Sequence, residues 1–103
     1  MALRSRAISE KRKEFFEETI KVYEETINLA TYLREEKIVA VVNFNLAVTY
    51  QEYSKISEKV ANCKKAVETF EAAINSFRKI RMQSLTILSE HYLRETKRLC
   101  DNN

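Results

Sequence analysis

The stretch that decides the fold is VANCKKAVETFEAAINSF, residues 60–77. Large or apolar side chains recur along it at alternating spacings of three and four positions. They are Val60, Cys63, Val67, Phe70, Ile74 and Phe77. Such spacings place side chains on one face of an α-helix, as in a seam between packed helices. The stretch therefore predicts a helix near 57–77 that buries this face.

The composition extends this prediction to the rest of the chain. Glycine and proline, which make most turns and end most helices, are both absent from the 103 residues. The chain is 45% hydrophobic and 32% charged, and this balance argues against disorder. We therefore expect an all-α fold in which residues 1–103 form a single helical domain.

Four antiparallel helices fit the pattern of apolar residues. Their predicted ranges are 9–30, 34–53, 57–77 and 80–99. Ser9 and Ser57 are the expected N-caps of the first and third helices, because a serine hydroxyl accepts hydrogen bonds from the free N–H groups that open a helix. No breaker marks segment 28–36, so it forms either a turn or a bend in one continuous helix. In the fourth helix, the expected buried stripe is Leu85, Leu88, Tyr92 and Leu99.

The chain also repeats itself. Ile8-Ser9-Glu10-Lys11 recurs at residues 56–59, 48 positions later, and the segment 23–28 is echoed at residues 70–75, 47 positions later. A repeat of this period is typical of stacked helical arrays, in which each unit buries its apolar face on the next. A plain four-helix bundle needs the same apolar stripes without a repeat, and it is the alternative.

The repeated segments resemble a known family. Ala66-x3-Phe70-x2-Ala73 resembles the second-helix pattern of the tetratricopeptide repeat, in which two small residues flank a large aromatic one. Two further motifs are similar to the patterns of that family: Thr19-x3-Tyr23-x2-Thr26 and Leu46-Ala47-x2-Tyr50. The period here is longer than the family's usual repeat of about 34 residues and is closer to that of HEAT and armadillo pairs. The resemblance implies an array that binds proteins or peptides.

The leading functional hypothesis is a non-enzymatic interaction or scaffold module that binds a partner peptide or helix between its second and fourth helices. In the resembled family, an asparagine at the position of Asn45 bonds the backbone of a bound peptide. The candidate contacts are Phe44, Asn45, Val48, Gln51, His91 and Glu95. So short an array has exposed ends, and we expect it to self-associate or to attach to a larger protein.

Two other functions stay open. The formal net charge is only +3, but basic residues gather toward the C-terminus. They are Arg78, Lys79, Arg81, Arg94, Lys97 and Arg98. A nucleic-acid-associated protein using these residues would bind in a strongly salt-dependent way. A purely structural homo-oligomer is the third possibility.

Signals for catalysis are sparse. Without glycine the chain has no phosphate-cradling loop, and one histidine with two cysteines is too few for a structural zinc site. We expect no enzymatic activity, no metal and no cofactor. Cys63 is interpreted as a small buried hydrophobe, and Cys100 as a tail residue able to bridge two chains on oxidation, in a reducing cytoplasmic setting. No apolar run is long enough for a membrane-spanning helix.

Overall fold

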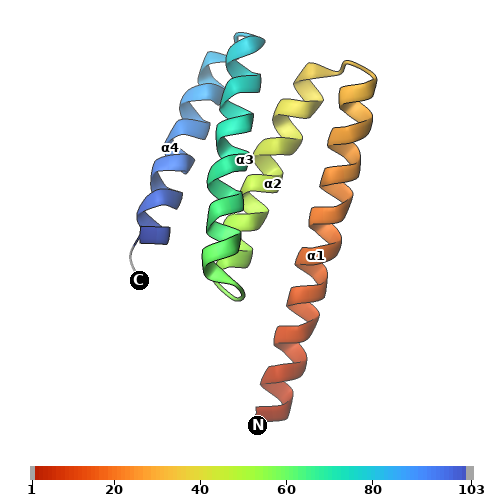
Figure 1. Cartoon of the computed structure of the whole chain (residues 1–103), viewed down its shortest axis with the longest axis vertical. Helices are drawn as coiled ribbons and strands as arrows, with labels where there is room; N and C mark the ends of the chain where they lie inside the picture. The colour runs from red at the N-terminus through yellow and green to blue at the C-terminus, as the bar shows by residue number, and fades with distance from the viewer. Residues whose placement is uncertain (1, 102–103) are drawn as a thin grey trace.

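A computed structural model describes the backbone of residues 2–101 and the side chains of residues 10–101. This part of the chain forms four antiparallel α-helices, shown in Figure 1, and the all-helical prediction is confirmed. The helices are α1 (Ala2–Tyr32), α2 (Glu36–Ser54), α3 (Lys59–Lys79) and α4 (Gln83–Asp101). The observed helices end about two residues later than expected, and α1 begins well before its predicted start.

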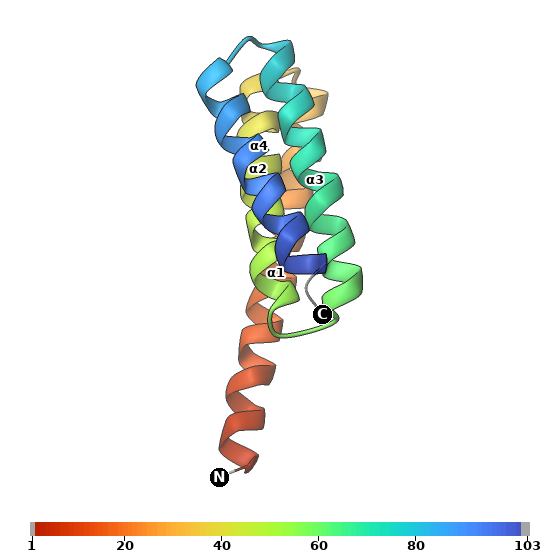
Figure 2. The ribbon, with the colours of Figure 1, turned by 90° about the vertical axis from the view of Figure 1, so that its left-hand side faces the viewer.

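The helices are packed in the order of the chain. Each one packs mainly on its neighbour in sequence, so α1 and α4 lie at opposite edges (Figure 1). The overall dimensions are 50 × 31 × 19 Å. The first turns of α1 extend beyond the turn that joins α2 to α3, as Figure 2 shows from the side. Since only adjacent helices share large interfaces, an edge helix has one face that no other helix covers.

The seam predicted in α3 is the centre of the core. Ala66, Phe70 and Ala73 are completely buried, as the small–aromatic–small spacing predicted. The Phe70 ring lies 5.8 Å from that of Phe44 on α2 and 5.9 Å from that of Tyr92 on α4. Small residues on either side of one large ring let both neighbouring helices approach α3 closely. Helices α2 and α4 therefore enclose Phe70 of α3, one of the largest fully buried side chains.

The first and third turns of the chain are the same structure placed 47 residues apart. Arg34 and Arg81 both adopt the left-handed conformation, with φ of 58° and 59°. The next residue donates its N–H to the carbonyl five positions back, Glu35 to Ala30 and Met82 to Phe77, each at 2.9 Å. This is a Schellman motif, which ends a helix by satisfying its last carbonyls. Segment 28–36 is therefore a turn rather than a bend in one helix.

The predicted serine caps are wrong. Ser9 lies inside α1, and Ser57 lies in the turn before α3, whose N-cap position is occupied by Glu58 in the left-handed region. Instead, the amide of Asn62 closes this turn by donating to the carbonyl of Ser57 at 2.9 Å. The Ile-Ser-Glu-Lys echo at 48 residues is therefore not a structural equivalence, whereas the echo at 47 residues is.

The stripe expected in α4 is also corrected. Leu88 and Leu99 are 42% and 45% exposed, and the side chains that α4 buries are the polar Thr86, Ser89 and Thr96. Each of these hydroxyls donates to the backbone carbonyl four residues earlier, at 2.7–3.0 Å. With the hydroxyl satisfied inside its own helix, a small polar side chain can be buried at little cost. In α3, Val60 was likewise expected in the seam but is 77% exposed.

The two cysteines form a disulfide within the chain. Cys63 at the start of α3 is bonded to Cys100 at the end of α4, with their Cα atoms 5.9 Å apart. Cys63 is buried as expected, but as half of a disulfide, and the expectation that Cys100 bridges two chains is corrected. The disulfide also removes the support for a reducing setting, because such bonds persist mainly in oxidising environments.

Candidate interaction surface

The groove predicted between α2 and α4 is partly filled by the protein itself. The ring of Phe44 packs edge-to-face on Tyr92 at 5.1 Å as well as on Phe70. Gln51 is buried, and its Nε2 donates to Oγ1 of Thr96 at 2.9 Å. These two predicted contact residues hold α2 to α3 and α4. A Gln51 substitution is therefore expected to weaken the fold as well as any contact with a partner.

The other four predicted contacts lie nearer the surface. Asn45 and His91 are exposed, whereas Val48 and Glu95 are half-buried. The ring of His91 approaches that of Tyr92 edge-on at 6.3 Å. The structure thus divides the predicted set between the core and the surface of α2 and α4. A partner-binding role for the exposed members stays a prediction.

The basic residues proposed for nucleic acid are partly neutralised. Arg78 pairs with Glu90 at 2.9 Å, and Lys79 pairs with Glu36 at the same distance. Arg98 donates to Glu95 at 2.6 Å. Arg81, Arg94 and Lys97 are exposed. Half of this set is therefore engaged with acidic side chains of the same chain, which lowers the positive potential that a phosphate backbone would meet.

A different surface stands out on α1, and the sequence reasoning missed it. One stripe of α1, which includes Phe16, Ile20 and Tyr23, packs against the core on the side of α2. Beside it runs a second stripe, spaced alternately by four and three residues, that we call the open face. It consists of Phe15, Thr19, Val22, Thr26, Leu29 and Leu33. The seven-residue recurrence of Phe15, Val22 and Leu29 is the sequence signal that could have revealed it.

The open face is apolar and uncovered. Phe15, Val22 and Leu29 are 66%, 57% and 60% exposed. The hydroxyls of Thr19 and Thr26 donate to the carbonyls of Phe15 and Val22, each at 2.8 Å. Because these hydroxyls are satisfied within α1, both threonines can present their methyl groups to a partner without leaving a donor unpaired.

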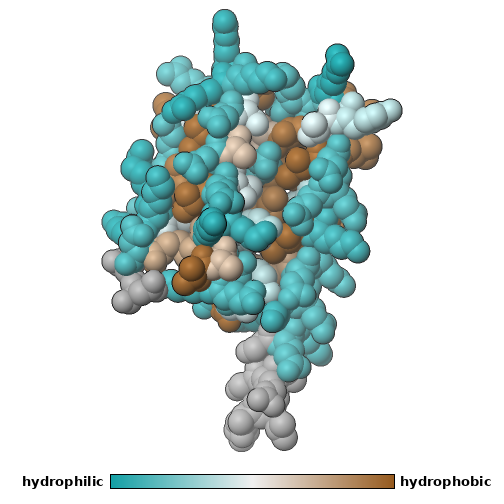
Figure 3. Space-filling view, in the orientation of Figure 1, coloured by the Kyte–Doolittle hydropathy of each residue, from teal (hydrophilic) through white to brown (hydrophobic). Residues whose placement is uncertain are grey.

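Charged residues border the open face. A surface hollow of about 320 Å³ is lined by Phe15, Thr19 and Val22 of the face, together with Glu18 and Tyr23. Figure 3 shows apolar surface at several places over α1 and α2, interrupted by hydrophilic side chains. An apolar stripe with a charged edge is the usual form of a helix-binding surface.

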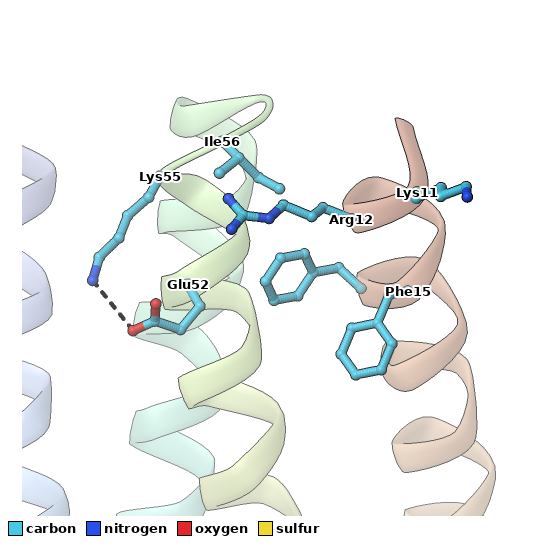
Figure 4. Close-up of a pocket in the computed structure, with 7 residues that line it drawn as sticks. Lys11, Arg12, Phe15, Glu52, Lys55 and Ile56 are labelled. Atoms are coloured by element: carbon cyan, nitrogen blue, oxygen red, sulfur yellow. Dashed lines mark hydrogen bonds and ion pairs between the residues drawn. The ribbon is translucent and has the colours of Figure 1, made fainter. Parts of the chain in front are cut away.

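The open face continues into a second surface hollow, about 640 Å³ in volume. Phe15 and Phe16 line it from α1, and Glu52 and Ile56 line it from the end of α2 and the following turn. Figure 4 shows Arg12 reaching from α1 toward Ile56 above the Phe15 ring. The hollow therefore lies between α1 and the end of α2 with the turn that follows it.

Tyr53 holds Phe16, one of the residues that line this hollow, in place. Its ring stacks on Phe16 at 5.2 Å, and its hydroxyl donates to the Glu17 carboxylate at 3.1 Å. Burial raises the pKa of Tyr53, and the neighbouring Glu17 carboxylate raises it further. Tyr53 therefore stays neutral over the physiological range and acts as an anchor between α1 and α2.

The described residues contain no cluster of acidic, histidine and cysteine side chains able to hold a metal ion. No helix in this part of the chain has the length and apolar content needed to cross a membrane. No family model, curated protein or solved structure matches the chain. The resemblance to tetratricopeptide repeats therefore stays a prediction.

Proposed function

We propose that the chain is a non-enzymatic protein-interaction module whose open face on α1 binds a helical segment of a partner. The observation that carries this proposal is the comparison of α1 with α3. The open face lies 47 residues before a set of α3 positions. Those positions are Asn62, Ala66, Thr69, Ala73, Ser76 and Ile80.

In α3 this set faces α2. Ala66 of α3 packs in a cluster with Leu46 and Tyr50 of α2, and Ala73 of α3 packs in a cluster with Ala40 of α2. Ala66 and Ala73 are fully buried, whereas Thr19 and Thr26 at the corresponding positions of α1 are only half-buried. Val22 and Leu29, which lie on the same face of α1, are more than half exposed. The face that α2 covers on α3 therefore has no helix over it on α1. A contiguous exposed apolar stripe of this kind marks an interaction site more often than it marks plain surface.

The same correspondence supports a helical-repeat array of tetratricopeptide-like type. In such an array each helix packs on the one before and the one after it, and terminal faces stay open for further units or partners. The surface of α2 and α4 that includes Asn45 and His91 is a second candidate contact. The open face is favoured over it because Phe44 and Gln51 are already engaged in the core.

Affinity capture with two matched variants tests the proposal. Val22→Glu places a charge in the middle of the open face, and Val60→Glu makes the same change at an exposed valine on α3. Proteins retained by the wild-type chain and by Val60→Glu are expected to be lost from Val22→Glu. Both variants should unfold at nearly the wild-type denaturant concentration, since both valines are exposed. Equal retention by all three chains would exclude the open face as the binding site.

The nucleic-acid alternative has a separate test. Retention of the chain on immobilised DNA or RNA should fall steeply with salt if the basic residues of α3 and α4 contact phosphates. Arg94→Glu should then weaken retention, and Val22→Glu should leave it unchanged. No retention at low salt would exclude this alternative.

A further inference from the structure

The helix α4 carries a face that corresponds to the covered face of α2. On α2, Ala40 packs on Ala73 and Phe77, and Phe44 packs on Phe70. The positions 47 residues later are Ile87 and His91 on α4. Ile87 is 56% exposed and His91 is exposed, so no helix covers this face of α4.

We propose that α4 of one copy of the chain seats on the open face of α1 of a second copy, in the place that α2 takes on α3. This inference rests on the proposed function, because it needs the open face to bind a helix. It names the helix as part of a second copy. The contact joins two different surfaces, so a third copy can be added at either end.

The register of this contact follows from the register of α2 on α3. Within the chain, Ala40 lies in one cluster with Ala73, Phe44 lies on Phe70, and Tyr50 lies in one cluster with Ala66. Each α2 residue of these pairs corresponds to the α4 residue 47 positions later, and each α3 residue corresponds to the α1 residue 47 positions earlier. The equivalent contact therefore places Ile87 of one copy over Thr26 of the next, and His91 over Tyr23. Ile87 and Leu88 then meet the apolar part of the open face around Val22 and Leu29. All four of these apolar side chains are exposed in the single chain.

The charges agree with the same register. Arg94 and Arg98, further along α4, come level with Glu18 at the border of the open face. These three side chains are exposed in the single chain. Opposite charges therefore meet at this end of the contact, and this complementarity favours the antiparallel orientation of the two helices.

A second copy of α1 is a poorer occupant of the open face. Two antiparallel α1 helices would bring Glu18 and Glu25 of one copy beside the same two residues of the other, and like charges at helix flanks repel. When α4 is the occupant, Glu18 instead comes level with Arg94 and Arg98. Charge thus favours the head-to-tail contact over a symmetric one.

Analytical ultracentrifugation of the full chain and of two blocked variants tests the proposal. Val22→Glu blocks the open face, and Ile87→Glu with Arg94→Glu blocks α4. The wild-type chain is expected to grow beyond the monomer mass as its concentration rises toward about 1 mM, the range of weak specific contacts. Raising the salt from about 0.05 M to about 0.5 M should reverse this growth, because the charge pairs are exposed. Val60→Glu is the matched control and should associate like the wild type.

The mixture of the two blocked variants decides the geometry. Each variant alone should stay monomeric, whereas the mixture should form one-to-one dimers and nothing larger, because one copy supplies an intact α4 and the other an intact open face. Self-association of the α4-blocked variant alone would overturn the proposal in favour of an α1–α1 contact. A wild-type chain that stays monomeric at every concentration would also overturn it. If such a monomer still loses its captured proteins through Val22→Glu, the proposed function stands and only this inference falls.

Discussion

The two helix pairs of this protein, α1 with α2 and α3 with α4, are built alike but joined differently. Phe16 and Tyr53 stack between α1 and α2, and the positions 47 residues later, Cys63 and Cys100, form the disulfide between α3 and α4. An aromatic stack and a covalent bond thus occupy the same place in the two pairs. The same packing of two helices can therefore be held together at this place either by stacked rings or by a disulfide.

The pairs also differ in what surrounds them. The second pair has α2 packed on α3, and α3 has a helix on both sides, whereas α1 has a helix on one side only. This difference accounts for the burial of Phe70 and for the half-exposure of Tyr23, which occupies the same place in the repeat. Position in the array, more than the type of residue, decides how much a seam residue contributes to stability.

The largest expected effect tests this point directly. Phe70→Ala should lower the free energy of unfolding by about 3–5 kcal/mol, because it empties a completely enclosed site. Tyr23→Ala should cost only about half as much, since part of its ring already contacts water. Urea unfolding of the two variants measures both losses. Equal losses would mean that α1 and α3 are equally enclosed, and would break the comparison.

The second prediction concerns the closing contacts. Replacing Cys63 and Cys100 by serine should cost about 2–4 kcal/mol, the usual gain from closing a loop of this length. A double-mutant cycle on Phe16 and Tyr53 should give a coupling of about 0.5–1.5 kcal/mol, typical of an aromatic pair. Denaturant unfolding with and without reductant measures the first value, and the double-serine chain is the control that reductant should not affect. A wild-type chain whose unfolding midpoint ignores reductant would contradict the first half.

The sequence predicted most of the fold because the seam residues are unambiguous. In α3, only a helix places Ala66, Phe70 and Ala73 on one face, and the absence of glycine and proline left no competing structure. The turn at Arg34 could not be predicted, because arginine has no preference for the left-handed conformation that it adopts there. Tertiary packing imposes that conformation, and sequence alone does not contain it.

The candidate site was less predictable than the fold. The groove prediction counted Phe44 and Gln51 as surface, because a helical pattern shows that a residue is apolar or polar but not which neighbour it meets. The disulfide depends on two helix ends meeting, and no local pattern reports that. The open face was overlooked for a related reason. Its residues adjoin the buried stripe of α1, so both stripes read together as one broad apolar face in the sequence.

The third prediction uses the anchor of the first pair. Tyr53→Phe removes the hydrogen bond to Glu17 and should cost about 1 kcal/mol near neutral pH. The raised pKa of Tyr53 also stabilises the folded state, because the folded state binds the phenolic proton more tightly than the unfolded state, in which the pKa is 10.0. This contribution is complete below pH 10.0 and is lost as the pH rises through the folded pKa.

Unfolding free energies measured between about pH 9 and about pH 11 test this behaviour. The wild-type chain should lose stability more steeply than Tyr53→Phe over that interval. Tyr50, whose pKa is also raised by burial and then by Glu24, adds to the slope in both chains. Parallel pH profiles for the two chains would show that ionisation of the Tyr53 hydroxyl does not change the free energy of unfolding.

The smallest predicted effect is the sharpest test of equivalence. Arg34 and Arg81 hold the same left-handed conformation, which costs a residue with a side chain about 1–2 kcal/mol relative to glycine. Glycine avoids this cost, but its greater conformational freedom in the unfolded chain offsets the benefit by about 0.5–1 kcal/mol. Arg34→Gly and Arg81→Gly should therefore each stabilise the protein by roughly 0.5–1 kcal/mol, and by the same amount within error.

Arg34→Ala and Arg81→Ala are the controls, and they should not stabilise the protein because alanine has the same unfavourable left-handed conformation. If only one glycine variant were stabilised in thermal and urea unfolding, the two turns would differ in energy despite their matching hydrogen bonds, and the 47-residue correspondence would hold for geometry alone.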